Sequence, residues 1–128
     1  MIHDGARPLV DNSILYRGFD AALDTGAATA AVPAKDTIKL ISGKGIVRET
    51  LPRDQLWHIQ TPQIFRYDLL MEAHRQCQED YTDDAAMVES LGVQVKVFWG
   101  SYDNIKVTTP GDLLFAETLV SLDKSESA

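Results

Sequence analysis

Two charged side chains with phosphate and metal chemistry lie near the start of the sequence, in the segment His3-Asp4-Gly5-Ala6-Arg7-Pro8. Mg²⁺ prefers oxygen ligands and is commonly held by one or two carboxylates together with substrate phosphates. The segment therefore predicts a site where Asp4 binds a divalent cation and Arg7 binds the phosphate that this cation also contacts. A second interpretation stays open, in which Asp4 and Arg7 form an ion pair that only stabilises a turn.

A single lysine lies in the short apolar run Ile105-Lys106-Val107. An ammonium group among apolar neighbours loses hydration energy unless an anion compensates it, and a phosphate is the obvious anion. Lys106 is therefore a second candidate for phosphate binding. The alternative is that Lys106 extends from an edge strand into solvent and binds nothing.

Thr82 and Arg53 are weaker candidates for binding. Thr82 is placed to begin a helix, where its hydroxyl and free backbone N–H groups would face an anion, but Asp83 and Asp84 beside it oppose one. Thr82 then only caps the helix in the alternative interpretation. Arg53 follows a predicted hairpin, so it lies where the chain reaches farthest toward another subunit.

The elements that must position these residues follow an α/β pattern, with strand-like segments alternating with helical ones around a sheet of parallel strands. A helix capped by a residue at 11–13 is expected to end at Gly26 and to lead into a strand over 27–32. The other expected elements are helices over 66–79, from Thr82 to Gly92 and from Thr109 onward, strands over 93–97 and 105–107, and a frayed tail over 123–128.

A hairpin interrupts this pattern, with strands predicted over 37–41 and 45–50 around the turn formers Ser42-Gly43-Lys44. An isolated two-stranded hairpin is marginally stable in water. We therefore expect residues 34–57 to form an arm that packs on a partner surface.

The composition, with 45% hydrophobic residues in 128, predicts that residues 1–128 form one compact domain or a large piece of one. The net charge of −7 argues against nucleic-acid binding. A single cysteine, Cys77, and the lack of a membrane-length apolar run predict a reduced, soluble, cytoplasmic chain.

The first residues, Ile2-His3-Asp4, resemble the last step of a strand whose beginning is absent. Doubly wound domains usually open with a strand and a glycine-rich turn, and neither occurs in the sequence. The sequence therefore predicts the C-terminal portion of a larger domain.

Five segments, taken in order, resemble the bacterial 2-C-methyl-D-erythritol 4-phosphate cytidylyltransferase family. They are His3-Asp4-Gly5-Ala6-Arg7-Pro8, residues 33–39 (PAKDTIK), residues 56–63 (LWHIQTPQ), Thr82-Asp83-Asp84-Ala85 and residues 100–110 (GSYDNIKVTTP). Ribitol- and glycerol-phosphate cytidylyltransferases share some of these segments and stay open as an alternative. The Asp36-Thr37-Ile38-Lys39 segment and Leu56-Trp57 favour the methylerythritol-phosphate enzymes.

The resemblance implies a fold, a reaction and site residues. The fold would be the C-terminal portion of a Rossmann-like nucleotidyltransferase domain with a β-hairpin dimerisation arm. The reaction would join CTP to 2-C-methyl-D-erythritol 4-phosphate with Mg²⁺, releasing pyrophosphate. By resemblance Asp4 and Lys106 would be catalytic, with Asp4 at the metal. Arg7 and Thr82 would bind the methylerythritol phosphate, and Thr37 and Arg53 would reach into the partner's site of a homodimer.

One part of the family pattern is missing. The family begins with a glycine-rich turn that holds the phosphates of CTP, and the sequence has no counterpart. We therefore expect the isolated chain to be an incomplete and inactive enzyme. Two alternatives stay open: an association module without catalysis, and an unrelated phosphate-binding domain.

Overall fold

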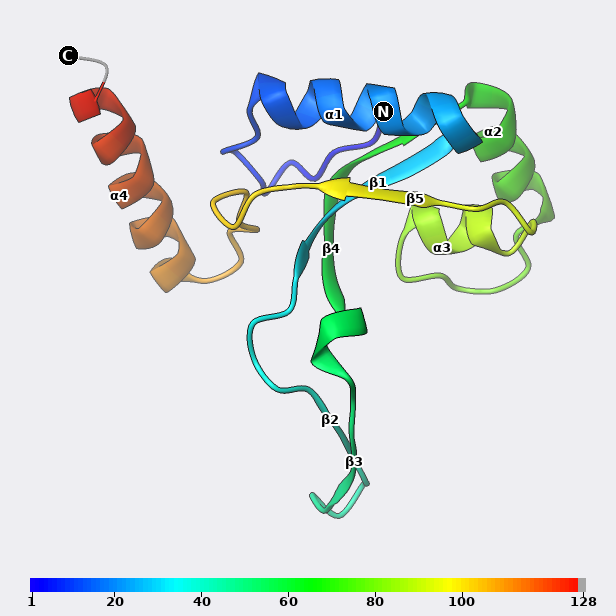
Figure 1. Ribbon diagram of the computed structural model, residues 1–128, viewed down its shortest axis with the longest axis horizontal. Coiled ribbons are helices and arrows are strands. Elements are labelled where there is room, and N and C mark those ends of the chain that lie inside the picture. The colour runs from blue at the N-terminus through cyan, green and yellow to red at the C-terminus, as the bar shows by residue number, and fades with distance from the viewer. Residues whose placement is uncertain (127–128) are drawn as a thin grey trace.

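The computed structural model describes residues 1–126, and its centre is a three-stranded sheet in the order β4-β1-β5 (Figure 1). The strands are β1 (Ala27–Pro33), β4 (Trp57–Phe65) and β5 (Lys96–Trp99). Strand β1 pairs in parallel with β5 and antiparallel with β4. The predicted α/β class is confirmed. The expectation that all strands run parallel is wrong, because the chain returns from β1 to β4 through the hairpin arm without a crossover helix.

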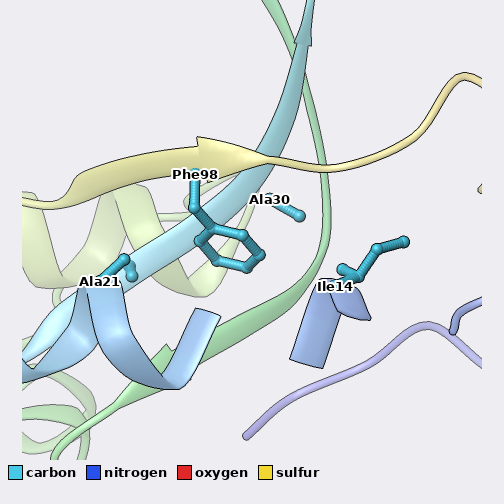
Figure 2. Close-up of a cluster of buried hydrophobic side chains, with 5 residues drawn as sticks. Ile14, Ala21, Ala30 and Phe98 are labelled. Carbon is cyan, nitrogen blue, oxygen red and sulfur yellow. The ribbon is translucent and has the colours of Figure 1, made fainter. Parts of the chain in front are cut away.

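Helix α1 (Asn12–Thr25) covers one face of the sheet. The Asp11 carboxylate accepts the Ile14 N–H at 2.9 Å, and Gly26 ends the helix at φ 81°, a left-handed conformation that favours glycine. Figure 2 shows the core beneath the helix, where Ile14 and Ala21 pack with Phe98 and the small residues of β1. Both helix ends agree with the sequence prediction.

Gly18 lets α1 approach the sheet closely, and Gly18→Ala is expected to destabilise the chain by about 1–3 kcal/mol. A Cβ at this position would lie 2.6 Å from Ile64 Cδ1 and 2.7 Å from Phe98 Cζ. The free energy of unfolding in urea measures the effect. Gly43→Ala is the matched control, because a Cβ added at Gly43 would have no neighbouring atom within 4 Å. Equal stability of both variants would contradict the tight contact.

Two helices pack around the other face and one end of the sheet, α2 (Tyr67–Gln76) and α3 (Asp84–Glu89). Ala73 of α2 and Val88 of α3 share a buried cluster with Ala27. Helix α2 ends before the predicted limit of residue 79. The N-cap of α3 is Asp83, whose carboxylate accepts the Ala86 N–H at 2.8 Å, so the prediction of Thr82 as N-cap is wrong.

The hairpin consists of β2 (Lys39–Ile41) and β3 (Val47–Thr50), followed by the 3₁₀ turn η1 (Arg53–Gln55). It projects away from the sheet as an arm, and every residue of both strands is exposed (Figure 1). The predicted hairpin is present with shorter strands. Its exposed side chains include the apolar residues Leu40, Ile41, Ile46 and Val47.

The C-terminal segment differs from prediction in three places. Strand β5 begins at Lys96, residues 105–107 form no strand, and α4 (Pro110–Glu126) continues past the predicted fraying point at residue 123. Residues 127–128 of the predicted tail lie outside the described part. Asp112 accepts N–H bonds from Thr108 and Thr109, and these bonds lower the pKa of its carboxyl. Within residues 1–126, no helix combines the length and apolarity that a membrane crossing requires.

Candidate functional site

A bulge in β4 forms the floor of the candidate site. Thr29 pairs with Gln63 and Ala31 with Ile59, so Ala30 alone faces the three residues 60–62. The Thr61–Pro62 peptide bond within them is cis. Bulges re-aim side chains next to active sites. Sequence analysis missed this strand, because a proline inside a polar segment argues against a strand.

The first loop of the site is fastened to this bulge. Ile2 forms an antiparallel bridge with Gln63, and the Asp4 N–H donates to Thr61 Oγ1 at 2.9 Å. The His3 ring lies between Thr61 Oγ1 (3.0 Å from Nδ1) and the Arg7 carbonyl (2.9 Å from Nε2). A carbonyl only accepts, so Nε2 donates to the Arg7 carbonyl. These bonds fix the backbone on both sides of Asp4.

Asp4, Arg7 and Lys106 meet in one ionic cluster. Asp4 Oδ2 lies 3.2 Å from Arg7 Nε and 3.5 Å from Lys106 Nζ. The exposed fractions of the side chains are 32% for Asp4, 11% for Arg7 and 52% for Lys106. Two cations share one carboxylate at the surface, which leaves a net positive charge. The cluster therefore suits an incoming anion such as a phosphate.

The structure shows the ion pair of the second sequence interpretation of the first loop, and binding of a cation and a phosphate there stays a prediction. Asp4 and Arg7 do form the turn-stabilising ion pair, and the Arg7 N–H also donates to the Asp4 carbonyl at 3.1 Å. The Asp4 carboxylate of this pair also contacts Lys106, which lies in a loop far away in the sequence. Lys106 does not extend from an edge strand, since residues 105–107 have no strand structure and its ammonium contacts Asp4.

The donor set of the cluster fits Mg²⁺ only with help from a substrate. No group of three or more His, Cys, Asp or Glu side chains suited to a metal occurs among residues 1–126. Asp4 offers one carboxylate, and both of its cation contacts go to Oδ2. One carboxylate plus phosphate oxygens is an arrangement that Mg²⁺ accepts.

Thr82 lines a cavity of about 240 Å³ between α3 and the sheet, and none of the three cluster residues is part of that lining. Thr29, Ile59 and Val97 also line it, together with the acidic Asp83 and Glu89. Thr82 is exposed, and the carboxylates beside it oppose an anion. A larger groove of about 770 Å³ lies away from the cluster, along residues 92–96.

Gln63 connects the Thr82 turn to the first loop, which carries Asp4 and Arg7. Its side chain is 2% exposed, donates to Asp83 Oδ2 at 2.8 Å and accepts the Ala85 N–H at 3.1 Å. Its backbone forms the bridge to Ile2. Sequence analysis did not identify this residue. The one sequence signal that could have identified Gln63 is its place in the Thr-Pro-Gln segment of the family resemblance.

Thr37 and Arg53 lie on the arm, where both are exposed. Arg53 donates to the Lys35 carbonyl at 2.8 Å, and no ion pair or hydrogen bond joins either residue to the cluster within the described chain. The structure therefore does not bring these two predicted residues together with Asp4 in one chain.

Aromatic contacts anchor the base of the arm. The rings of Trp57 and Trp99 meet edge to face at 5.2 Å, and Lys35 Nζ lies 3.7 Å from the centre of the Tyr102 ring. The Tyr102 hydroxyl donates to the Pro33 carbonyl at 2.8 Å. These contacts fix where the arm leaves the sheet.

Comparison with curated proteins gives close relatives. A 2-C-methyl-D-erythritol 4-phosphate cytidylyltransferase from Dehalococcoides mccartyi (strain ATCC BAA-2266) is 53% identical over 120 residues, covering 94% of this chain and 53% of the relative. The enzyme of that name from Pelotomaculum thermopropionicum is also 53% identical, over 123 residues, covering 94% and 52%. The chain thus spans about half the length of the curated relatives it matches.

Comparisons with solved structures and with a family model lead to the same family as the curated relatives. The 2-C-methyl-D-erythritol 4-phosphate cytidylyltransferase of Thermus thermophilus has a TM-score of 0.82 at 38% identity, covering 91% of this chain and 59% of that one. The 4-diphosphocytidyl-2C-methyl-D-erythritol synthase of Anaerococcus prevotii has a TM-score of 0.85 at 33% identity, covering 93% and 57%. The family model of 2-C-methyl-D-erythritol 4-phosphate cytidylyltransferase matches residues 1–122, and the chain belongs to this family.

Proposed function

We propose that this chain carries the methylerythritol-phosphate side of a cytidylyltransferase site. The reaction joins CTP to 2-C-methyl-D-erythritol 4-phosphate and gives 4-diphosphocytidyl-2-C-methyl-D-erythritol and pyrophosphate. The observation that carries the proposal is the cluster of Asp4, Arg7 and Lys106, which combines a surplus of positive charge with one carboxylate. Family membership supplies the substrates. The single cysteine favours the cytoplasm as the compartment.

The chemistry places two polyanions next to each other. A phosphate oxygen of the substrate attacks the α-phosphorus of CTP in line, a new P–O bond forms, and the bond to pyrophosphate breaks. Arg7 binds the incoming phosphate, because its guanidinium is already oriented by Asp4 and by the Asn104 carbonyl, 2.7 Å from Nη1. Lys106 stabilises the charge on the reacting phosphoryl oxygens.

Asp4 has two tasks in the proposed site. It orients Arg7 and Lys106 through their contacts with Oδ2. It is also the residue that would hold Mg²⁺, which neutralises triphosphate charge when bound. Thr82 would bind the substrate from the neighbouring turn, to which Gln63 links the cluster.

The arm would complete the site of a second copy. Every residue of β2 and β3 is exposed, and among the described residues no ion pair or hydrogen bond joins Thr37 or Arg53 to the cluster of its own chain. An isolated hairpin is marginal in water, and its exposed apolar side chains favour burial against a partner. We therefore propose a homodimer in which Thr37 and Arg53 bind substrate in the partner's site.

Binding of methylerythritol phosphate to the 128-residue chain tests the cluster. We expect Lys106→Ala to weaken binding by about tenfold in calorimetric titrations, since a charge-assisted contact to phosphate is lost. Lys96→Ala is the matched control: its ammonium is 48% exposed and pairs with Asp24, away from the cluster. Equal losses in both variants, or no binding by the unmodified chain, would contradict the proposed site.

The 128-residue chain without further segments is expected to release no pyrophosphate from CTP. The two substrates bring several negative charges together, and the cluster opposes them with Arg7 and Lys106 alone. The measurement is pyrophosphate release at saturating CTP and Mg²⁺, with and without methylerythritol phosphate. Substrate-dependent release at the roughly 1–10³ s⁻¹ usual for enzymes would show that the chain is catalytically sufficient.

A further inference from the structure

Irregular backbone carries all three members of the ionic cluster. Asp4 and Arg7 come from the loop after Ile2, and Lys106 comes from the loop between β5 and α4. Sheet hydrogen bonds hold only the edges of these loops: Ile2 bridges to Gln63, and the Gly100 N–H donates to the Ala31 carbonyl at 2.9 Å. Besides the Lys106–Asp4 ion pair, two hydrogen bonds join them: the Val107 N–H donates to the Ala6 carbonyl at 2.8 Å, and Arg7 Nη1 donates to the Asn104 carbonyl at 2.7 Å. The geometry of the cluster therefore depends on what holds residues 101–107.

Asn104 holds this second loop on the β4 bulge. Its side chain is fully buried, at 0% exposure, and its amide donates to the Thr61 carbonyl at 2.8 Å and to Gln60 Oε1 at 3.2 Å. Gln60 in turn donates to the Ser101 carbonyl at 2.9 Å. The bulge that fixes Asp4 through the Thr61 hydroxyl thus also fixes Asn104, through the carbonyl of the same residue.

The contacts of Asn104 connect the two halves of the cluster. Its side chain binds the bulge, its carbonyl binds Arg7, and Lys106 lies two residues farther along the chain. Only the NH₂ side of the amide is used, because no donor reaches its buried Oδ1 within residues 1–126. A leucine would have similar size and no unpaired acceptor, so packing alone does not explain an asparagine here.

We propose that Asn104 is a positioning residue, which sets Arg7 and Lys106 at phosphate-binding distance from Asp4 by fastening their shared loop to the Gln60–Thr61 bulge. This inference rests on the proposed function, because it assigns Asn104 to the same phosphate site. Asn104 is buried and touches no substrate itself. Its effect passes through the two cations.

Methylerythritol phosphate binding to four forms of the 128-residue chain tests the inference: the unmodified chain, Asn104→Leu, Lys106→Ala and the double variant. We expect Asn104→Leu to weaken binding at least about tenfold, and the double variant to lose less than the product of the two single losses. A residue that only stabilises the fold would give the full product. That outcome, or unchanged binding by Asn104→Leu, overturns the inference.

Hydrogen exchange of the Val107 amide is a second readout that needs no ligand. In Asn104→Leu this amide is expected to exchange at least about tenfold faster, while the Phe19 amide inside α1 keeps its rate. Gln63→Leu is the matched control, since Gln63 is a buried amide whose side chain binds the α3 turn instead. Unchanged Val107 exchange in Asn104→Leu overturns the inference whatever the binding result.

A further variant keeps the inference testable if Asn104→Leu fails to fold. Gln60→Met keeps the length of the side chain but removes the acceptor for Asn104 and the bond to Ser101. It is expected to speed Val107 exchange and to weaken binding in the same direction, and absence of both effects overturns the inference. The unmodified chain could fail to bind methylerythritol phosphate while Val107 exchanges fast in both Asn104→Leu and Gln60→Met. That result would contradict the substrate assignment but support the positioning of the loop by Asn104.

Discussion

Replacing Lys106 with alanine is expected to lower kcat for cytidylyl transfer by on the order of 10²–10³ while changing the KM for CTP far less. The measurement uses a chimera in which residues 1–128 follow the amino-terminal half of the Dehalococcoides mccartyi relative, which is 53% identical over the shared region. A cation at the reacting phosphorus acts mainly on charge that develops in the transition state. Its loss therefore appears in kcat.

The surroundings of Lys106 indicate that the variant keeps its fold, so a lower kcat would not reflect unfolding. Lys106 is half exposed and touches the cluster only through the Asp4 carboxylate, so its removal leaves the fold intact. Lys96→Ala in the same chimera is the control, because it removes an equally exposed ammonium from the far end of the sheet. An unchanged kcat in Lys106→Ala would refute a catalytic role. A raised KM alone would reduce the role to substrate binding.

Sequence analysis identified the members of the ionic cluster, because short-range chemistry marks them. Asp4 and Arg7 are three residues apart in a turn, and Lys106 lies in an apolar run that makes a solitary charge conspicuous. Only the family resemblance implied that they share one site, since nothing in their spacing shows that they meet. Their meeting depends on hydrogen bonds between residues far apart in the chain, such as Arg7 to Asn104, 97 positions apart, and Asn104 to Thr61, 43 positions apart.

The missed elements share a physical cause. Strand β4 has a proline and several polar residues, and its bulge shows only when β1 is placed beside it. Sequence analysis assigned no role to Gln60 and Gln63, yet both are buried because distant backbone groups satisfy their polar side chains. The prediction of Thr82 as the N-cap failed for a local reason, since Asp83 caps the helix in its place.

Arg53 is expected to act in the partner's site, so two inactive chimeras should restore activity when mixed. The structure carries Arg53 on an exposed arm with no ion pair or hydrogen bond to the cluster of its own chain, among the residues described. In a two-fold dimer each site would then combine Lys106 of one subunit with Arg53 of the other. Arg53→Ala and Lys106→Ala chimeras are each expected to lose most of their activity.

Unfolding the two chimeras together and refolding them allows random pairing. Half of the dimers are then mixed, and each mixed dimer has one site with both lesions and one with neither, so about a quarter of all sites regain wild-type chemistry. Activity should rise to about a quarter of the unmodified level, far above either parent. Arg7→Ala mixed with Lys106→Ala is the control, because both residues belong to the cluster of one chain and no mixed dimer contains an intact site. If mass spectrometry confirms mixed dimers and the Arg53 pair still fails to exceed its parents, Arg53 does not act across the dimer and the arm has another purpose.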